Sequence, residues 1–207
     1  MEAMPTLAAF AAAYDAGAAQ VVWTRLVADL ETPVSAYLKL AADKPMSFLL
    51  ESVEGGATRG RYSVIGLEPD LVWRADGDQA FINRTPLAKP DAFTREPQPT
   101  LASLRALLAD SQIALPAELP PMAAGIFGYM GYDTVRLMER LPNTPPDALH
   151  IPDGILMRPT VMAIFDIIRD EITIVSPVRA DAIPSSASSR TSYGAPMAIR
   201  RSSTARR

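Results

Sequence analysis

Apolar residues recur at helical spacing in three stretches of the chain, which predicts three amphipathic helices. The three stripes are Leu7, Phe10, Ala11 and Tyr14; Val34, Tyr37, Leu38 and Ala41; and Leu101, Leu104, Leu107 and Leu108. The second helix is the best marked, because Thr32 can cap it and Pro33 suits its first position. Residues 135–140 predict one more short helix.

Runs of β-branched and aromatic residues, some of them alternating with polar ones, predict strands. The predicted strands are residues 21–27, 46–52, 62–66, 71–75, 80–83, 123–129, 160–165 and 171–176. Asp76-Gly77 favours a tight hairpin between two of these strands, and Arg169-Asp170 marks the turn of the last pair.

The strands fall in hairpin-like clusters with helices between them, separated by proline-rich loops at residues 84–100 and 142–159. This order predicts an α+β fold with antiparallel sheets layered with helices, because a doubly wound parallel sheet needs regular alternation of strand and helix. We expect residues 1–180 to form the folded domain. Residues 181–207 are rich in Ser and Arg and poor in large apolar residues, which predicts a disordered tail.

The composition excludes several kinds of site. The chain has no cysteine and a single histidine, His150, which excludes disulfides, thiol nucleophiles and multi-histidine metal sites. The longest apolar run, residues 164–168, is interrupted by Asp166 and falls far short of the roughly 20 residues of a membrane span. The N-terminus has no basic segment ahead of an apolar one, so we expect no secretory signal and a cytoplasmic protein.

The charge pattern does not favour nucleic acid as a partner. The formal net charge is −3, and charges of both signs are interspersed over the predicted domain. Five of the 20 basic residues follow Ile183, and none of the 23 acidic residues does. We expect neither a nucleic-acid nor a membrane partner, and we interpret the basic tail as passive.

The strand that ends in Leu49-Leu50-Glu51-Ser52 offers a candidate binding group. Alternation places Leu50 and Ser52 on one face and Glu51 on the other, unless a bulge intervenes. A ligand on the Ser52 face would meet the Ser52 hydroxyl and main-chain groups of Glu51. A serine beside apolar neighbours can anchor the ammonium or carboxylate of an amino acid, although such a serine more commonly satisfies a turn.

Several segments together resemble one enzyme family. They are Gln20 to Trp23, Thr32 to Leu40, Phe48 to Ser52, Gly60 to Gly66, and Pro120 to Asp133 with its Gly-Tyr-x-x-Tyr-Asp pattern. In order and spacing, from about residue 8 to Arg179, the chain resembles anthranilate synthase component I, a lyase that opens tryptophan biosynthesis. The resemblance implies a domain that contributes to feedback inhibition by L-tryptophan.

The resemblance also implies roles for individual residues. Ser52 corresponds to the family's tryptophan-contacting serine, Glu51 adjoins it, and Arg61 is the candidate for a basic residue near the same site. The family's chorismate- and Mg²⁺-binding glutamates, its acid/base lysine and part of its tryptophan pocket belong to a catalytic half with no counterpart here. We therefore assign no catalytic, cofactor-binding or metal-binding residue, and we expect no catalysis by this chain alone.

The complete enzyme converts chorismate and glutamine-derived ammonia to anthranilate and pyruvate with Mg²⁺, which this chain is not expected to bind. Its partner is a glutamine amidotransferase subunit, component II, and the segment Tyr129 to Asp133 lies near the association surface in the family. We favour a simpler interpretation, with Tyr129 and Tyr132 as core aromatics and Asp133 as a helix cap.

Two other functions stay open, together with the origin of the tail. One alternative is component I of aminodeoxychorismate synthase, from the folate pathway, and the other is a non-catalytic module for amino-acid binding or subunit docking. The change to a Ser/Arg-rich sequence after Ala182 suggests a shifted reading frame or a truncated gene.

Overall fold

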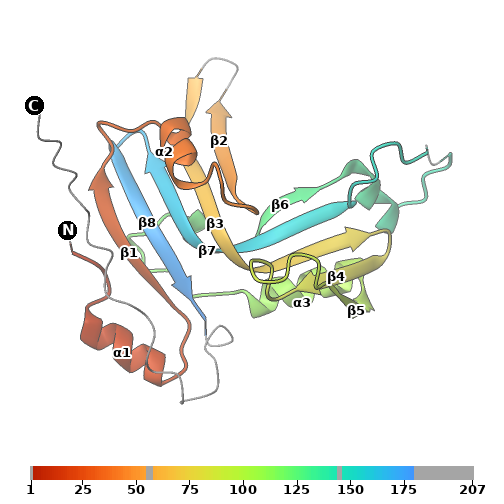
Figure 1. Cartoon of the computed structure of the whole chain (residues 1–207), viewed down its shortest axis with the longest axis horizontal. Coiled ribbons are helices and arrows are strands. Elements are labelled where there is room, and N and C mark those ends of the chain that lie inside the picture. Colours follow the sequence, from red (N-terminus) through yellow and green to blue (C-terminus); the bar gives the residue numbers. More distant parts are fainter. Residues whose placement is uncertain (1, 55–57, 144–145, 180–207) are drawn as a thin grey trace, which may run out of the picture.

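The computed structural model describes residues 2–54, 58–143 and 146–179. Within these ranges the chain forms an antiparallel sheet of eight strands, with helices packed against it (Figure 1). This architecture confirms the predicted α+β class. The elements are α1 (Leu7–Asp15), β1 (Gln20–Val27), α2 (Pro33–Leu40), β2 (Phe48–Glu54), β3 (Thr58–Asp76), β4 (Gln79–Asn83), β5 (Thr94–Pro99), α3 (Thr100–Asp110), η1 (Pro121–Ala123), β6 (Phe127–Met130), η2 (Tyr132–Leu137), β7 (Gly154–Asp166) and β8 (Glu171–Val178).

The predicted tail at residues 181–207 lies outside the described residues, and so does the end of the predicted domain. Among the helices that the structure describes, none is long and apolar enough to cross a membrane.

Two long strands, β3 and β7, run side by side through the whole sheet and divide it into two wings. In the first wing, β2 flanks the start of β3, and β8 and β1 continue the sheet beyond the end of β7. In the second wing, β6 flanks the start of β7, and β4 and β5 continue beyond the end of β3. Figure 1 shows the sheet bending where the wings meet. At the bend Pro69 pairs with Pro159, and the register shifts before Leu71.

Both faces of the first wing are covered. On one face Val64, Ile164 and Val175 pack against Leu119 and Ala123 of the segment that follows α3. On the other face the sheet residues Ile65 and Phe165 pack against Ala36 and Ala41, which lie in and just after α2. Functional side chains of this wing can therefore reach solvent only at its edges and around the covering segments.

The second wing buries its α3 side. Trp73, Ala80 and Leu107 form a core there, and the Trp73 indole N–H donates to Ser103 Oγ at 3.0 Å. Trp73 is fully buried, so this hydrogen bond satisfies a donor that water cannot reach.

Several predicted elements are confirmed. The three helices form where the spacing predicts, and the side chain of Thr32 caps α2 by accepting from the Ser35 amide at 3.1 Å. The final hairpin pairs as expected, with Phe165 opposite Ile172. The Asp76-Gly77 hairpin also forms, with Asp76 opposite Gln79 and Gly77 at a positive φ of 53°.

Other predicted boundaries are wrong. Residues 62–75 form one continuous strand, because Pro69 is accommodated at the bend. The predicted loop 84–100 contains the edge strand β5, and the predicted loop 142–159 contains the start of β7. The strand predicted at 123–129 begins only at Phe127, and the helix predicted at 135–140 is a 3₁₀ turn that begins at Tyr132.

The predicted buried face of α2 is also partly wrong. The helix buries Pro33 and Ala36, while the side chains of Val34 and Leu38 point outward with exposed fractions of 49% and 61%. Of the predicted stripe, Ala41 is buried and Tyr37 packs against the same core, whereas Val34 and Leu38 face solvent.

Candidate functional site

Glu51 and Ser52 lie on β2 where its pairing with β3 becomes irregular. Glu51 pairs with Ser63, and the register shifts between Glu51 and Val53. This irregularity is the kind of bulge that breaks strict alternation, and both Glu51 and Ser52 are exposed to solvent. Their side chains are therefore accessible to a ligand.

Ser52 lies directly against Gly60 on the neighbouring strand. A β-carbon added at Gly60 would approach the Ser52 hydroxyl oxygen to 2.0 Å, well inside contact distance. Only glycine leaves room there for the serine hydroxyl, so Gly60 is part of what positions Ser52. Since Arg61 follows Gly60 in the chain, this contact brings Ser52 next to the backbone of the third predicted residue.

The Arg61 side chain is held by Asp166, at the end of β7. Arg61 Nη2 donates to Asp166 Oδ2 at 2.7 Å, and Arg61 Nε lies 3.1 Å from both carboxylate oxygens. The Arg61 guanidinium lies 4.8 Å from the centre of the Tyr62 ring. The hydrogen bonds from Arg61 lower the pKa of Asp166, and the same bonds raise the pKa of Arg61. Both groups are therefore charged throughout the ordinary pH range.

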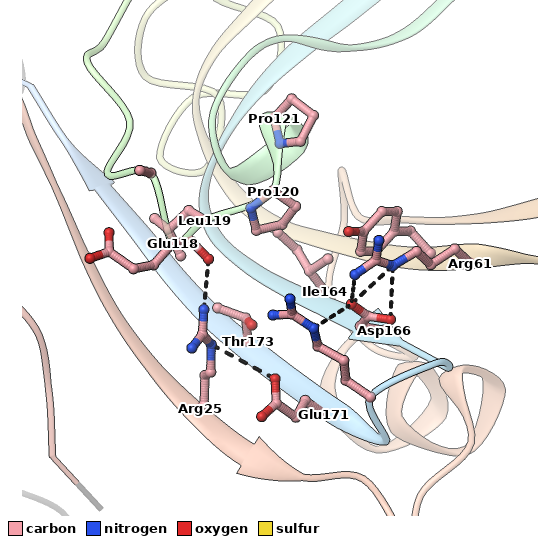
Figure 2. A pocket seen from close by; sticks show the side chains of 13 residues that line it. Arg25, Arg61, Glu118, Leu119, Pro120, Pro121, Ile164, Asp166, Glu171 and Thr173 are labelled. Carbon is pink, nitrogen blue, oxygen red and sulfur yellow. Dashed lines mark hydrogen bonds and ion pairs between the residues drawn. The ribbon is translucent and has the colours of Figure 1, made fainter.

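Arg61 and Asp166 line a hollow of about 270 Å³, which we call the arginine hollow. Its floor and walls come from β1, β3, β7, β8, the turn after β7 and residues 117–121 (Figure 2). The charged lining residues are Arg25, Arg61, Arg169, Glu118, Asp166 and Glu171. Leu119, Pro120 and Ile164 supply apolar surface. Ser52 and Glu51 are not among its lining residues, so the structure places Arg61 here and the other two predicted residues beside it on the β2–β3 pair.

The segment Tyr129 to Asp133 lies at the surface of the second wing, which contradicts the prediction of core aromatics. Tyr132 is 82% exposed, and the Tyr129 hydroxyl donates to the Pro152 carbonyl at 2.9 Å. Asp133 is not the helix cap either, since Gly131 occupies that position and Asp133 accepts from Arg136 Nε at 2.6 Å.

These residues border a second hollow of about 730 Å³, between residues 129–137 and 146–153, which we call the tyrosine groove. Its exposed apolar side chains include Tyr132, Leu149 and Ile151, and its rim carries Asp133, Asp147 and Asp153. His150 is also exposed and lies 3.5 Å from Asp147, as expected for a residue outside any buried acid/base site.

Metal ions in proteins bind characteristic sets of ligands. Among the residues that the structure describes, no group of three or more histidine, cysteine, aspartate or glutamate side chains converges. In the arginine hollow, Asp166 and Glu171 both lie near guanidinium groups, which disfavours a cation beside them.

The chain is similar in sequence to proteins named anthranilate synthase component 1. It is 49% identical over 174 residues to the protein from Cereibacter sphaeroides, a match that covers 84% of this chain and 35% of the relative. It is 41% identical over 157 residues to the protein from Thermus thermophilus, covering 74% of this chain and 31% of the relative. The chain belongs to the anthranilate synthase component 1 family. It spans about a third of the length of these relatives.

The similarity extends to the fold. The solved structure of anthranilate synthase component I from Streptococcus pneumoniae TIGR4 superposes with a TM-score of 0.50 at 20% identity, over 78% of this chain and 33% of that one. No family model matches the chain. The sequence comparisons confirm the family indicated by the sequence, and the structural comparison confirms the fold.

Sequence reasoning missed the partners of Arg61. Its ion-pair partner Asp166 lies 105 positions further along the chain, and Arg25 and Pro120, which line the same hollow, belong to still other elements. The predicted β7–β8 hairpin placed Asp166 at a strand end, but nothing in the sequence indicates that this strand end pairs with Arg61.

Proposed function

We propose that this chain is the tryptophan-sensing N-terminal part of anthranilate synthase component I in a cytoplasmic tryptophan pathway. The observation that carries the proposal is the 49% identity to an anthranilate synthase component 1 over 84% of the chain. Anthranilate is favoured over aminodeoxychorismate as the pathway product, because the relatives described above all carry the anthranilate name.

Ser52, Glu51 and Arg61 are proposed to contact L-tryptophan. Support comes from the exposure of Ser52 and Glu51 at the irregularity in β2, and from the half-exposed guanidinium of Arg61 on the neighbouring strand. A hydroxyl and a guanidinium are suitable partners for the charged groups of an amino acid.

The conversion of chorismate and ammonia to anthranilate and pyruvate is proposed for the complete enzyme, with Mg²⁺ held by parts of the family that this chain does not span. Purified 207-residue chain should therefore form no anthranilate from chorismate and ammonium in the presence of Mg²⁺, measured by anthranilate fluorescence. Magnesium-dependent product formation that is lost on mutation of a carboxylate of this chain would contradict this expectation.

Feedback is tested in a chimaera that carries this chain followed by the remainder of the Cereibacter relative. Ser52→Ala should weaken tryptophan inhibition about ten- to a hundredfold, because a hydrogen bond to a charged ligand is worth roughly 1.5–3 kcal/mol. Turnover of chorismate should change little. Unchanged inhibition would exclude Ser52 from the site, and an equal loss of turnover would show a structural role instead.

A glutamine amidotransferase, component II, is the proposed partner of the complete enzyme, and the tyrosine groove is its proposed docking site. The groove combines exposed Tyr132 and Leu149 with an acidic rim, which suits an apolar projection flanked by basic residues. In the same chimaera, Tyr132→Ala should weaken co-purification with component II while ammonia-dependent turnover is retained.

A non-catalytic binding or docking module is the alternative function. It is favoured if the 207-residue chain alone is a monodisperse monomer that binds tryptophan at micromolar concentration, because the remainder of the family would then be dispensable for sensing.

A further inference from the structure

A row of side chains crosses the second wing on the face that points away from α3, which we call the open face. Trp73 packs against α3, so its neighbour Arg74 points to the opposite side of the sheet. Paired residues of antiparallel strands share a face, which extends the row from Arg74 over the neighbouring strands. The row consists of Arg95, Phe81, Arg74, Ile155 and Tyr129, from β5, β4, β3, β7 and β6 in turn.

Arg74, at the centre of this row, has a guanidinium group without an acceptor. It forms no hydrogen bond or ion pair with any residue that the structure describes, and its Nε atom is buried. The guanidinium carbon lies 5.1 Å from the centre of the Phe81 ring and 4.7 Å from that of the Phe93 ring. These cation–π contacts hold the side chain in place, but they leave its N–H donors unused.

Other arginines that are partly or fully buried do have oxygen partners. Arg136 Nε donates to Asp133 at 2.6 Å, and Arg158 Nε donates to Asp70 at 2.8 Å. Arg74 has no such acceptor, because even Asp76, two residues along β3, forms no ion pair with it. A guanidinium that has lost part of its water shell without gaining an acceptor is unfavourable, and an external anion would remove this cost.

The row suits a carboxylate that is carried by a protein surface. A carboxylate can accept two parallel N–H bonds from one guanidinium, and no acidic side chain belongs to the row to compete for Arg74. Adjacent strands lie 4.7–4.9 Å apart, so the row is about 19 Å wide, which exceeds a single small ligand. Arginine together with aromatic side chains is also typical of the centres of protein interfaces.

We propose that the open face binds the remaining part of the component I polypeptide, with Arg74 donating to an aspartate or glutamate side chain of that part. The chain spans about a third of the length of its relatives. In a complete component I the remaining residues are tethered to this domain, so they meet the open face at a far higher effective concentration than a separate protein does. This inference rests on the proposed function, since it takes the chain as the N-terminal part of that enzyme.

The test compares one substitution in two proteins, the 207-residue chain and the chimaera with the remainder of the Cereibacter relative. Arg74→Met removes the charge and keeps an unbranched side chain between the two phenyl rings. In the 207-residue chain it should lower the melting temperature by no more than about 2 °C, because a guanidinium without an acceptor is lost. In the chimaera it should lower the melting temperature by at least about 5 °C, because a carboxylate of the remainder is left buried without its partner.

Two further variants sharpen the comparison. Arg105→Met is the matched control, because Arg105 is an exposed arginine on α3, which covers the other face of the wing. It should change the melting temperature of both proteins little. Arg74→Lys should restore only part of the loss in the chimaera, because an ammonium group lacks the planar pair of donors that fits a carboxylate.

The outcomes separate the possible occupants of the open face. An equal fall in melting temperature in both proteins overturns the proposal, because Arg74 is then needed by this domain itself. No effect in either protein also overturns it. Tyr129 borders the tyrosine groove, so component II is the competing occupant. Weaker co-purification of Arg74→Met chimaera with component II, at an unchanged melting temperature, would assign the open face to component II instead.

Failure of this inference is distinguishable from failure of the proposed function. Anthranilate formation and tryptophan feedback of the unmodified chimaera test the proposed function, and neither measurement involves a change at Arg74. A chimaera that is active and feedback-sensitive, but whose stability is indifferent to Arg74→Met, retains the proposed function and overturns only the docking of the open face.

Discussion

At the scale of single residues, buried and half-buried polar groups of this chain depend on partners far away in sequence. Arg61 finds Asp166 across 105 positions, and Trp73 finds Ser103 across 30. Arg158 and Asp70 form a further pair at the bend, with Arg158 Nε 2.8 Å from Asp70 Oδ1. Such contacts fix how elements lie on one another, and they allow sharper tests than the surface charges do.

The ion pair between Arg61 and Asp166 predicts a pH dependence. Because Arg61 holds the pKa of Asp166 below its usual range, the pair adds stability above the unfolded-state pKa of about 4 and loses it as the pH falls through the folded-state pKa. Asp166→Asn should therefore lower the melting temperature at pH 7, and the difference from the unmodified chain should shrink towards pH 3. Thermal melts across this range measure it. A difference that stays constant with pH would exclude the ion pair as its cause.

The buried hydrogen bond from Trp73 predicts a loss of stability in Ser103→Ala. The variant leaves the indole N–H unpaired in a dry core, which costs about 1–3 kcal/mol. In a Trp73→Phe background the same serine change should cost clearly less, because the donor is already gone. Denaturant unfolding of the four proteins gives the coupling, and equal costs in both backgrounds would contradict it.

At the scale of elements, the local pattern predicts where the helices and the buried hairpin form, but it fails for edge strands and for which helix face is buried. The β7–β8 hairpin was predictable, since its apolar alternation matches the faces that it buries. Helix α3 was predictable as a helix, but its buried residues are Thr100, Ser103 and Leu107, while Leu108 of the predicted stripe is exposed.

Strand β5, with the sequence Thr94 to Pro99, was not predictable. It contains two prolines and two charges, which are tolerated because it pairs on one side only, with β4. Pro69 likewise hides the continuity of β3, because its tolerance depends on the bend and on Pro159.

The close approach of β6 to β7 predicts different effects for two similar glycines. Gly125 and Gly128 have φ angles of 153° and 155°, so backbone strain from a side chain is similar at both. A β-carbon at Gly128 would come within 2.0 Å of the Ile155 carbonyl oxygen, whereas one at Gly125 would meet only the Phe127 ring at 3.7 Å. Gly128→Ala should therefore cost about 1–3 kcal/mol more than Gly125→Ala. Denaturant unfolding of both variants measures this difference, and equal costs would show that β6 can move away from β7.

At the scale of the whole molecule, the domain buries a core in each wing but leaves large apolar side chains in solvent. Leu30, Val34 and Leu38 are spaced four residues apart along α2 and the segment before it, and Leu30 is 88% exposed. The helix pattern predicted Val34 and Leu38 as core residues, and the wrong prediction has a physical reason. Helix α2 packs on the sheet through the small residues Ala36 and Ala41, so Val34 and Leu38 take its outer side. The sequence alone does not separate the two kinds of apolar position, because both follow the same helical spacing.

The exposed stripe of α2 predicts self-association of the 207-residue chain. Contiguous apolar side chains in water favour contacts that remove them from it, at roughly 25 cal/mol for each Å² buried. Leu38→Glu should reduce the association and leave the melting temperature nearly unchanged, because Leu38 is 61% exposed.

Ala36→Glu, two residues away and only 8% exposed, should instead unfold the domain or lower its melting temperature strongly, because it places a charge in the core beneath α2. Sedimentation velocity over a range of concentrations, with thermal melts of the same samples, separates the two effects. Two outcomes would contradict this prediction: the unmodified chain stays monomeric at high micromolar concentration, or Leu38→Glu associates as strongly as the unmodified chain. Either result would show that the exposed side chains of α2 do not mediate self-association. The apolar side chains of the tyrosine groove would then be tested next.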